Sequence, residues 1–116
     1  MSETLLYKIF RPKEWQNFRE VGVFAGSAHD LRDGYIHLSG GAQLARTLAK
    51  HFAQDASVIV AEIDAPRLNG ALRWEPAADG TLFPHLYAPL RMDALVRAVR
   101  HVRGTAGWQA AEAVAP

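Results

Sequence analysis

The stretch Ser57-Val58-Ile59-Val60-Ala61-Glu62-Ile63 is the strongest strand signal in the chain. It is a near-continuous apolar run, and such a run predicts a strand that is buried on both faces. A strand of this kind lies inside a sheet, so the rest of the sequence has to supply the neighbouring strands and the helices that cover them.

The other elements are predicted from apolar periodicity and from Pro and Gly at element ends. Apolar side chains spaced three or four apart indicate helices, whereas alternation indicates strands. In chain order we predict a strand over 5–10, a helix from Pro12 to Gly22, a turn-rich loop over 26–34, a strand over 35–39, a helix over about 42–52, a hairpin of two strands over 71–75 and 81–87, and a last helix over about 90–102.

Strands with helices inserted early and late predict an α+β fold. A chain of 116 residues can close one hydrophobic core, so we expect a single domain over residues 1–104. Pro84 indicates that the second hairpin strand is an edge strand or is locally irregular. Residues 105–116 are alanine-rich, and we expect them to form a mobile tail except where Trp108 docks.

Composition excludes several classes of protein. Hydrophobic residues make up 49% of the chain, and 13 Lys+Arg face 12 Asp+Glu, so neither a disordered chain nor a DNA-backbone binder is indicated. The absence of cysteine removes disulfides, thiolate nucleophiles and Cys-based zinc sites. The N-terminus does not resemble a signal peptide, and no apolar run approaches the roughly 18 residues of a membrane helix, so we expect a cytoplasmic protein.

Two predicted strands carry the residues best suited to chemistry. Tyr35, His37 and Ser39 share one face of the first strand, and His85 and Tyr87 share one face of the second. Imidazole exchanges protons near neutral pH, and a phenol ring can stack on a ligand ring while its hydroxyl binds a polar edge. The two strands together predict one wall of a site for a heteroaromatic ligand.

Ser39 precedes Gly40 and Gly41 at the predicted start of a helix. Free backbone N–H groups at such a position favour an anion, and glycines allow phosphate to approach the backbone. Ser39 can instead simply cap the helix, which is the commoner role of serine there.

Glu75 ends the first hairpin strand, with Arg73 on the same face. A carboxylate close to stacked rings can bind ribose hydroxyls or stabilise a developing cation. The alternative is a surface Arg–Glu pair of small energetic value. His29, Asp30 and Asp33 resemble part of a metal site, but a single imidazole in a loop is too little, so no metal is expected.

The ordered set of short sequences resembles domain of unknown function 952 (DUF952), a family of small bacterial proteins. The resemblance spans roughly residues 5–100 and excludes the tail after about residue 104. It rests on Tyr7-Lys8-Ile9, Trp15, Gly26-Ser27, the run from Asp33 to Ser39, Glu62-Ile63-Asp64, Leu72-Arg73-Trp74-Glu75 and the run from Phe83 to Tyr87.

This resemblance implies membership, by fold, of the ADP-ribosyltransferase-like superfamily. It then implies a split or bent, mostly antiparallel sheet that holds NAD in a cleft. His37, in the sequence His-Leu-Ser, would hold the ribose next to nicotinamide together with Ser39, and Tyr35 or Tyr87 would stack on the nicotinamide ring. Glu75 is the candidate catalytic carboxylate by its chemistry alone, and His85 would line the same pocket.

Three functions therefore remain open. The first is an NAD- or nucleotide-binding domain with ADP-ribosyltransferase-like activity. The second is a non-catalytic module that binds a nucleotide or another metabolite. The third is a two-histidine phosphoesterase, which His37 and Ser39 fit, whereas Tyr87 stands where that class needs a small hydroxyl residue after His85.

Overall fold

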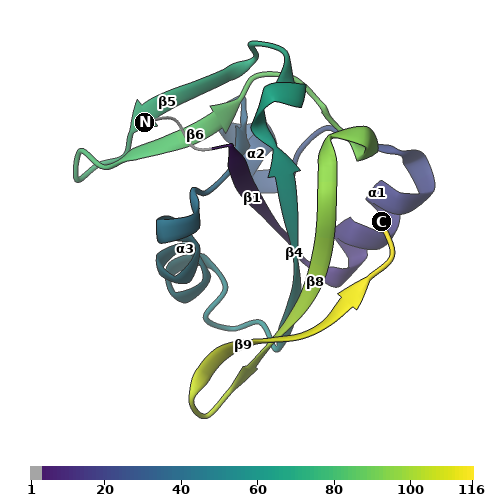
Figure 1. Ribbon diagram of the computed structural model, residues 1–116. Helices are drawn as coiled ribbons and strands as arrows, with labels where there is room; N and C mark the ends of the chain where they lie inside the picture. Colours follow the sequence, from purple (N-terminus) through teal and green to yellow (C-terminus); the bar gives the residue numbers. More distant parts are fainter. Residues whose placement is uncertain (1–3) are drawn as a thin grey trace.

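The strands form three antiparallel sheets, ordered β1-β4-β8-β9, β2-β7 and β3-β6-β5 (Figure 1). With only three helices among residues 4–116, this arrangement confirms the predicted α+β class. The computed structural model describes residues 4–116, with β1 Leu5–Phe10, α1 Pro12–Val21, β2 Val23–Phe24, α2 Ala28–Asp33, β3 Ile36–His37, α3 Leu44–His51, β4 Ser57–Asp64, β5 Leu72–Pro76, β6 Leu82–Leu86, β7 Leu90–Arg91, β8 Leu95–Gly104 and β9 Gly107–Val114, and short 3-10 turns at Gly41–Gln43, Ala65–Leu68 and Met92–Ala94.

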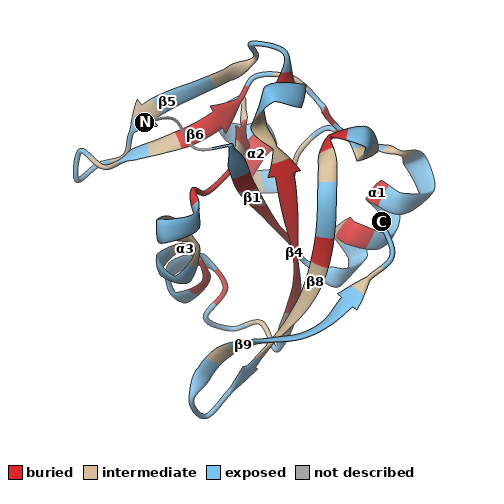
Figure 2. Cartoon of the chain, viewed as in Figure 1, coloured by how far each residue is buried: buried red, intermediate tan, exposed pale blue. Residues whose placement is uncertain are grey.

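Strand β4 lies at the centre of the largest sheet, between β1 and β8. Val58 and Val60 pack into a cluster on one face of the sheet, whereas Ile59, Ala61 and Ile63 pack into the main core on the other. The burial of β4 on both faces, visible as a red strand in Figure 2, confirms the prediction made from its apolar run.

Helices α1 and α3 cover opposite faces of this sheet (Figure 1). Trp15 and Phe18 of α1 pack against Phe10 of β1, with ring centroids 5.4–5.5 Å apart. On the other face, Leu48 of α3 and the following Phe52 pack against β4. Each helix therefore buries the apolar stripe from which it was predicted.

The two larger sheets are joined through Ser39. Its backbone N–H donates to the carbonyl of Tyr7 at 2.9 Å, and its carbonyl accepts from the N–H of Tyr7 at 2.8 Å. One residue earlier, Leu38 donates to the carbonyl of Pro84 at 3.0 Å. The segment after β3 thus connects β6 of one sheet to β1 of the other.

The expected loop over 26–34 contains a helix, α2, because Ser27 and Asp30 form a reciprocal cap at its start. Strand β3 covers only two residues of the predicted 35–39. Pro84 lies in β6, the central strand of its sheet, so it does not mark an edge. The missing N–H of Pro84 is tolerated there, while its carbonyl accepts from Leu38.

The predicted helix over 90–102 is wrong. Residues 90–91 form β7, and β8 begins at Leu95 and pairs with β4 along most of its length. Val96, Val99 and Val102 are β-branched, which favours a strand, and pairing with the buried β4 outweighs the helical spacing of the apolar residues.

The expected C-terminal tail is also a strand. Residues 107–114 form β9, which pairs with β8 through a tight turn between Gly104 and Gly107. Trp108 packs against the cluster beneath α3, as expected of a docking residue. The sheet therefore extends to Val114 instead of ending with the domain predicted over 1–104. No helix within residues 4–116 has the length and apolar character needed to cross a bilayer.

We expect deletion of residues 105–116 to destabilise the protein by about 2 kcal/mol, because it removes β9 and Trp108. For a domain of this size, the melting temperature should fall by roughly 10 °C. Differential scanning calorimetry of the truncated and full-length chains measures this difference. Equal melting temperatures would contradict a structural role for β9.

Candidate functional site

A pocket of about 630 Å³ lies where the two larger sheets meet. Its walls come from β1, α2, β3, α3 and β6, so it forms only when segments distant in sequence assemble. Its volume lies within the usual range of small-molecule sites. This pocket is the candidate functional site.

Four of the six site residues predicted from sequence line this pocket: Tyr35, His37, Ser39 and His85. His37 and His85 are directly opposite each other in the pairing of β3 with β6, and their ring centroids are 5.6 Å apart. The ring of Tyr35 stacks on His85 at 3.9 Å and lies 4.7 Å from His37. The polar faces of the two strands are thus turned toward one hollow.

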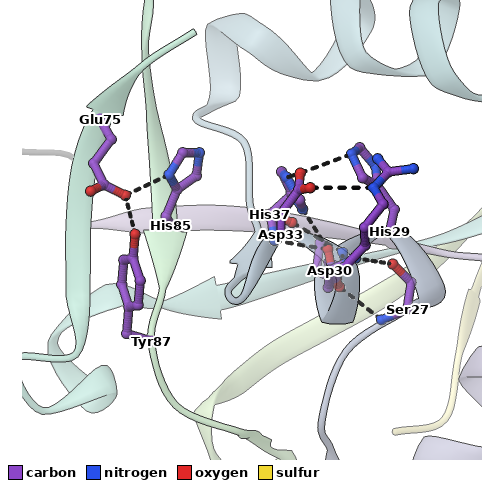
Figure 3. Close-up of polar contacts among 10 residues, drawn as sticks. Ser27, His29, Asp30, Asp33, His37, Glu75, His85 and Tyr87 are labelled. Atoms are coloured by element: carbon purple, nitrogen blue, oxygen red, sulfur yellow. Dashed lines mark hydrogen bonds and ion pairs between the residues drawn. The ribbon is translucent and has the colours of Figure 1, made fainter.

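Glu75 and Tyr87, the other two predicted residues, lie behind His85 and are not part of the pocket lining. The same Glu75 oxygen, Oε1, is 2.7 Å from Nδ1 of His85 and accepts a hydrogen bond from the Tyr87 hydroxyl at 2.7 Å (Figure 3). The bonds from Tyr87 and His85 lower the pKa of Glu75 below its ordinary value. Glu75 can therefore act on a ligand only through His85, and the predicted surface pair with Arg73 is replaced by these contacts.

His37 is held by a second carboxylate, that of Asp30. Nδ1 of His37 is 2.6 Å from Oδ1 of Asp30, and the backbone N–H of His37 donates to the same oxygen at 3.1 Å. The other oxygen, Oδ2, accepts from Nζ of Lys8 and from the N–H of Ser27, both at 2.9 Å. Asp30 thus fixes the position of His37 while its second oxygen is itself held in place.

Asp30 is ionised in this setting although its side chain is only 2% exposed. Burial alone would raise the pKa of Asp30, but the bond with His37, the charge of Lys8 and the N–H of Ser27 together outweigh burial and hold the pKa well below its usual range. Two imidazoles, each backed by a carboxylate, therefore face the same pocket.

Ser39 does not cap a helix. Its hydroxyl is 3.0 Å from the hydroxyl of Thr47 on α3, and Gly40 occupies the position that precedes the 3-10 turn at Gly41–Gln43. Capping fails because that turn separates Ser39 from the start of α3. Ser39 is buried and lines the pocket.

The pocket lining also carries three basic side chains from outside the histidine cluster, together with the carboxylate of Glu14. Arg11, Arg46 and Lys50 line the pocket, Arg11 from the residue before α1 and the other two from α3. Arg11 pairs with Asp55 at 3.1 Å, and Arg46 pairs with Asp79 at 2.6 Å, and both carboxylates lie outside the lining. These cations, Lys50 above all, are the groups of the lining suited to an anionic group.

Sequence reasoning missed Lys8 and His51 and undervalued Asp30. The spacing Ser27-x-x-Asp30 is that of a capping box, and it could have indicated both α2 and the inward direction of Asp30. Lys8 is buried on β1, an unusual place for a charge, and one that points to a buried partner. His51 is exposed but also lines the pocket.

The fold and the pocket define the chain as a small α+β domain of antiparallel sheets with a polar pocket at their junction. The family model described as "Protein of unknown function (DUF952)" matches residues 9–98. The chain belongs to this family, as the ordered short sequences predicted.

Solved structures of one protein, CC0527 from Caulobacter crescentus, are similar to the chain. Its crystal structure is 40% identical in sequence with a TM-score of 0.85, covering 91% of this chain and 94% of that chain. Its solution NMR structure is also 40% identical, with a TM-score of 0.80, and covers 91% of each. No functionally curated protein matches the chain.

Proposed function

We propose that the pocket binds a nucleotide, and that this nucleotide is NAD. The observation that carries the proposal is the cluster of Tyr35, His37 and His85 in a pocket whose lining also carries Arg and Lys side chains. A base, a sugar and a diphosphate need those three kinds of partner: a ring, hydrogen-bonding groups and cations.

Each part of the ligand has a suitable place. The diphosphate would lie near Arg11, Arg46 and Lys50, where charge-assisted hydrogen bonds are available. Hydroxyls of the ribose would bond to Ser39 and His37, and the base would stack near Tyr35. Tyr35 is preferred over Tyr87 for this role because Tyr87 lies outside the pocket lining.

The resemblance to the ADP-ribosyltransferase-like superfamily supports NAD over other nucleotides. The sequence His37-Leu38-Ser39 corresponds to the early-strand position that holds the ribose next to nicotinamide in that superfamily. The two larger sheets, joined at Ser39, are compatible with its split, bent sheet. NAD is abundant in the cytoplasm, the compartment that we propose for the protein.

The reaction that we propose is cleavage of the bond between nicotinamide and ribose. The electron pair of this bond leaves with the nicotinamide nitrogen, and the ribose carbon becomes cationic. Water or an acceptor hydroxyl then attacks that carbon, and His85 takes the proton of the attacking group. Glu75 holds Nδ1 of His85, which leaves Nε2 as the atom that accepts the proton.

A non-catalytic nucleotide-binding module is the alternative when no bond is broken. A phosphoesterase is a second candidate because His37 and His85 are paired opposite each other, each with a carboxylate partner, as an acid and a base need to be. Incubation with 2′,3′-cyclic nucleotides tests this candidate directly, and their hydrolysis would favour it over NAD cleavage.

Thermal shift and titration calorimetry with NAD test the binding proposal. A ligand at about 100 times its Kd stabilises the folded state by about 2.7 kcal/mol, which gives a clear rise in melting temperature. We expect His37→Ala to abolish the rise, and Lys50→Ala to weaken binding about tenfold, or roughly 1.4 kcal/mol.

Lys13→Ala is the matched control, because Lys13 is an exposed lysine of α1 outside the pocket lining. It should leave the affinity for NAD unchanged. If neither NAD, ADP-ribose nor any mononucleotide raises the melting temperature, the nucleotide proposal is wrong. If NAD binds but no nicotinamide is released, the binding-module alternative holds.

A further inference from the structure

We propose that His29, Asp33 and His37 form a binding site for a divalent transition-metal ion, with zinc as the best fit. The two imidazoles converge on one carboxylate oxygen: Oδ2 of Asp33 is 3.1 Å from Nε2 of His29 and 3.0 Å from Nε2 of His37 (Figure 3). This site goes beyond nucleotide binding and does not depend on it.

The spacing of these atoms fits a shared metal ion. One ligand atom from each residue lies within 4.8 Å of the other two. Zinc–nitrogen and zinc–oxygen bonds of about 2.0–2.2 Å place neighbouring ligand atoms roughly 3.0–3.5 Å apart. An ion between the three side chains therefore needs only small adjustments of partly exposed side chains.

Two imidazoles and one carboxylate are a ligand set that zinc uses in catalytic sites. Such sites keep a further coordination position open for water or substrate. Here His29 and His37 both line the pocket, so the open position would face the space that we assign to the nucleotide. A water molecule would fill it, or a ribose hydroxyl of the nucleotide, and His37 would then hold the ribose through the ion.

Asp30 supplies the second argument for a metal. Histidine ligands of metals commonly donate their other ring N–H to a carboxylate, which fixes the tautomer. With Nδ1 of His37 held by Asp30, Nε2 is the ring nitrogen that faces Asp33 and the pocket, where it can bind a metal ion.

The position of His29 strengthens the argument. His29 and Asp33 are one turn apart on α2, so their side chains project from the same side of the helix. The ring of His29 also lies against that of His37, with centroids 4.3 Å apart. His29 and His37 therefore lie side by side, with Asp33 within reach of both rings.

Zinc binding to the untagged full-length protein tests the site. After removal of metals with EDTA and dialysis, titration calorimetry with zinc chloride should show one strong site per chain. Cobalt(II) in place of zinc should give the visible absorption bands of a site with nitrogen ligands. His29→Ala and Asp33→Asn should each weaken zinc binding by at least about 100-fold, because each removes a ligand.

Both variants change partly exposed side chains, so the fold is expected to survive and circular dichroism checks that it does. His101→Ala is the matched control, since it removes an imidazole of β8 outside the pocket and should leave zinc affinity unchanged. The proposal is overturned if the wild-type protein takes up no zinc, or if His29→Ala binds zinc as tightly as the wild type. All measurements are made without nucleotide, so a failure of NAD binding leaves this result unaffected.

Discussion

Replacing Asp30 by alanine is expected to lower the free energy of unfolding by about 3–5 kcal/mol, the usual cost of removing one partner of a buried ion pair. The change leaves the ammonium group of Lys8 buried without its carboxylate at 2.9 Å. It also removes the bond from the N–H of Ser27, which is one half of the reciprocal cap of α2, and both bonds to His37. Urea denaturation in the presence of EDTA measures this loss.

Asp33→Ala is the matched control, because Asp33 lies on the same helix and also contacts His37 but is about one-third exposed. Its ion pairs are at the surface, so the loss of stability should be small beside that of the Asp30 variant. Equal losses for the two variants would contradict the assignment of Asp30 as the buried centre of this network. The Asp30 variant should also bind zinc more weakly in any fraction that still folds.

Glu75→Gln is expected to slow release of nicotinamide from NAD by about 100-fold or more, the usual contribution of general acid–base catalysis. The substitution keeps the size of the side chain but removes the charge that holds Nδ1 of His85. Because Glu75 is a positioning residue outside the pocket lining, the Kd for NAD should not change. The effect should therefore appear in kcat and not in KM.

His85→Ala should reduce kcat as much as Glu75→Gln, and the double variant should be no slower, because the two residues act as one unit. Glu112→Gln is the control, since Glu112 is an exposed carboxylate of β9 that pairs with Arg100. A loss that appears only in KM would show that Glu75 shapes the pocket instead of supporting the chemistry. Unchanged kcat in Glu75→Gln would overturn the proposed role of the pair.

Several features of the site followed from the sequence alone. Alternation placed Tyr35, His37 and Ser39 on one face of a strand, and the same rule placed His85 with Tyr87. The hairpin of β5 and β6 was also predicted, and it brings Glu75 within reach of His85. Local periodicity is sufficient for these statements, since each concerns residues close together in the chain.

Other features depend on contacts that no local pattern contains. The spacing of apolar residues over 90–102 predicted a helix, but most of this segment belongs to β8. It pairs with β4, which lies about 40 residues earlier in the chain. The proposed metal cluster depends on helix α2, for which the sequence predicted a loop. It also depends on the position of His37 beside His29 and Asp33. A single imidazole in a loop gave no reason to expect a metal. The second imidazole, that of His37, comes close to His29 only because α2 packs against β3.

The sequence by itself determined the α+β class, the buried central strand and the family. Apolar runs and short ordered sequences can be recognised without knowing which distant residues are in contact. Tertiary structure alone decided that β9 completes the sheet, that Asp30 is buried beside His37, and that Glu75 reaches the pocket only through His85. These three results depend on the pairing of strands and on buried charges. Both are settled by the total burial and hydrogen bonding of the folded chain and not by the preferences of any one segment.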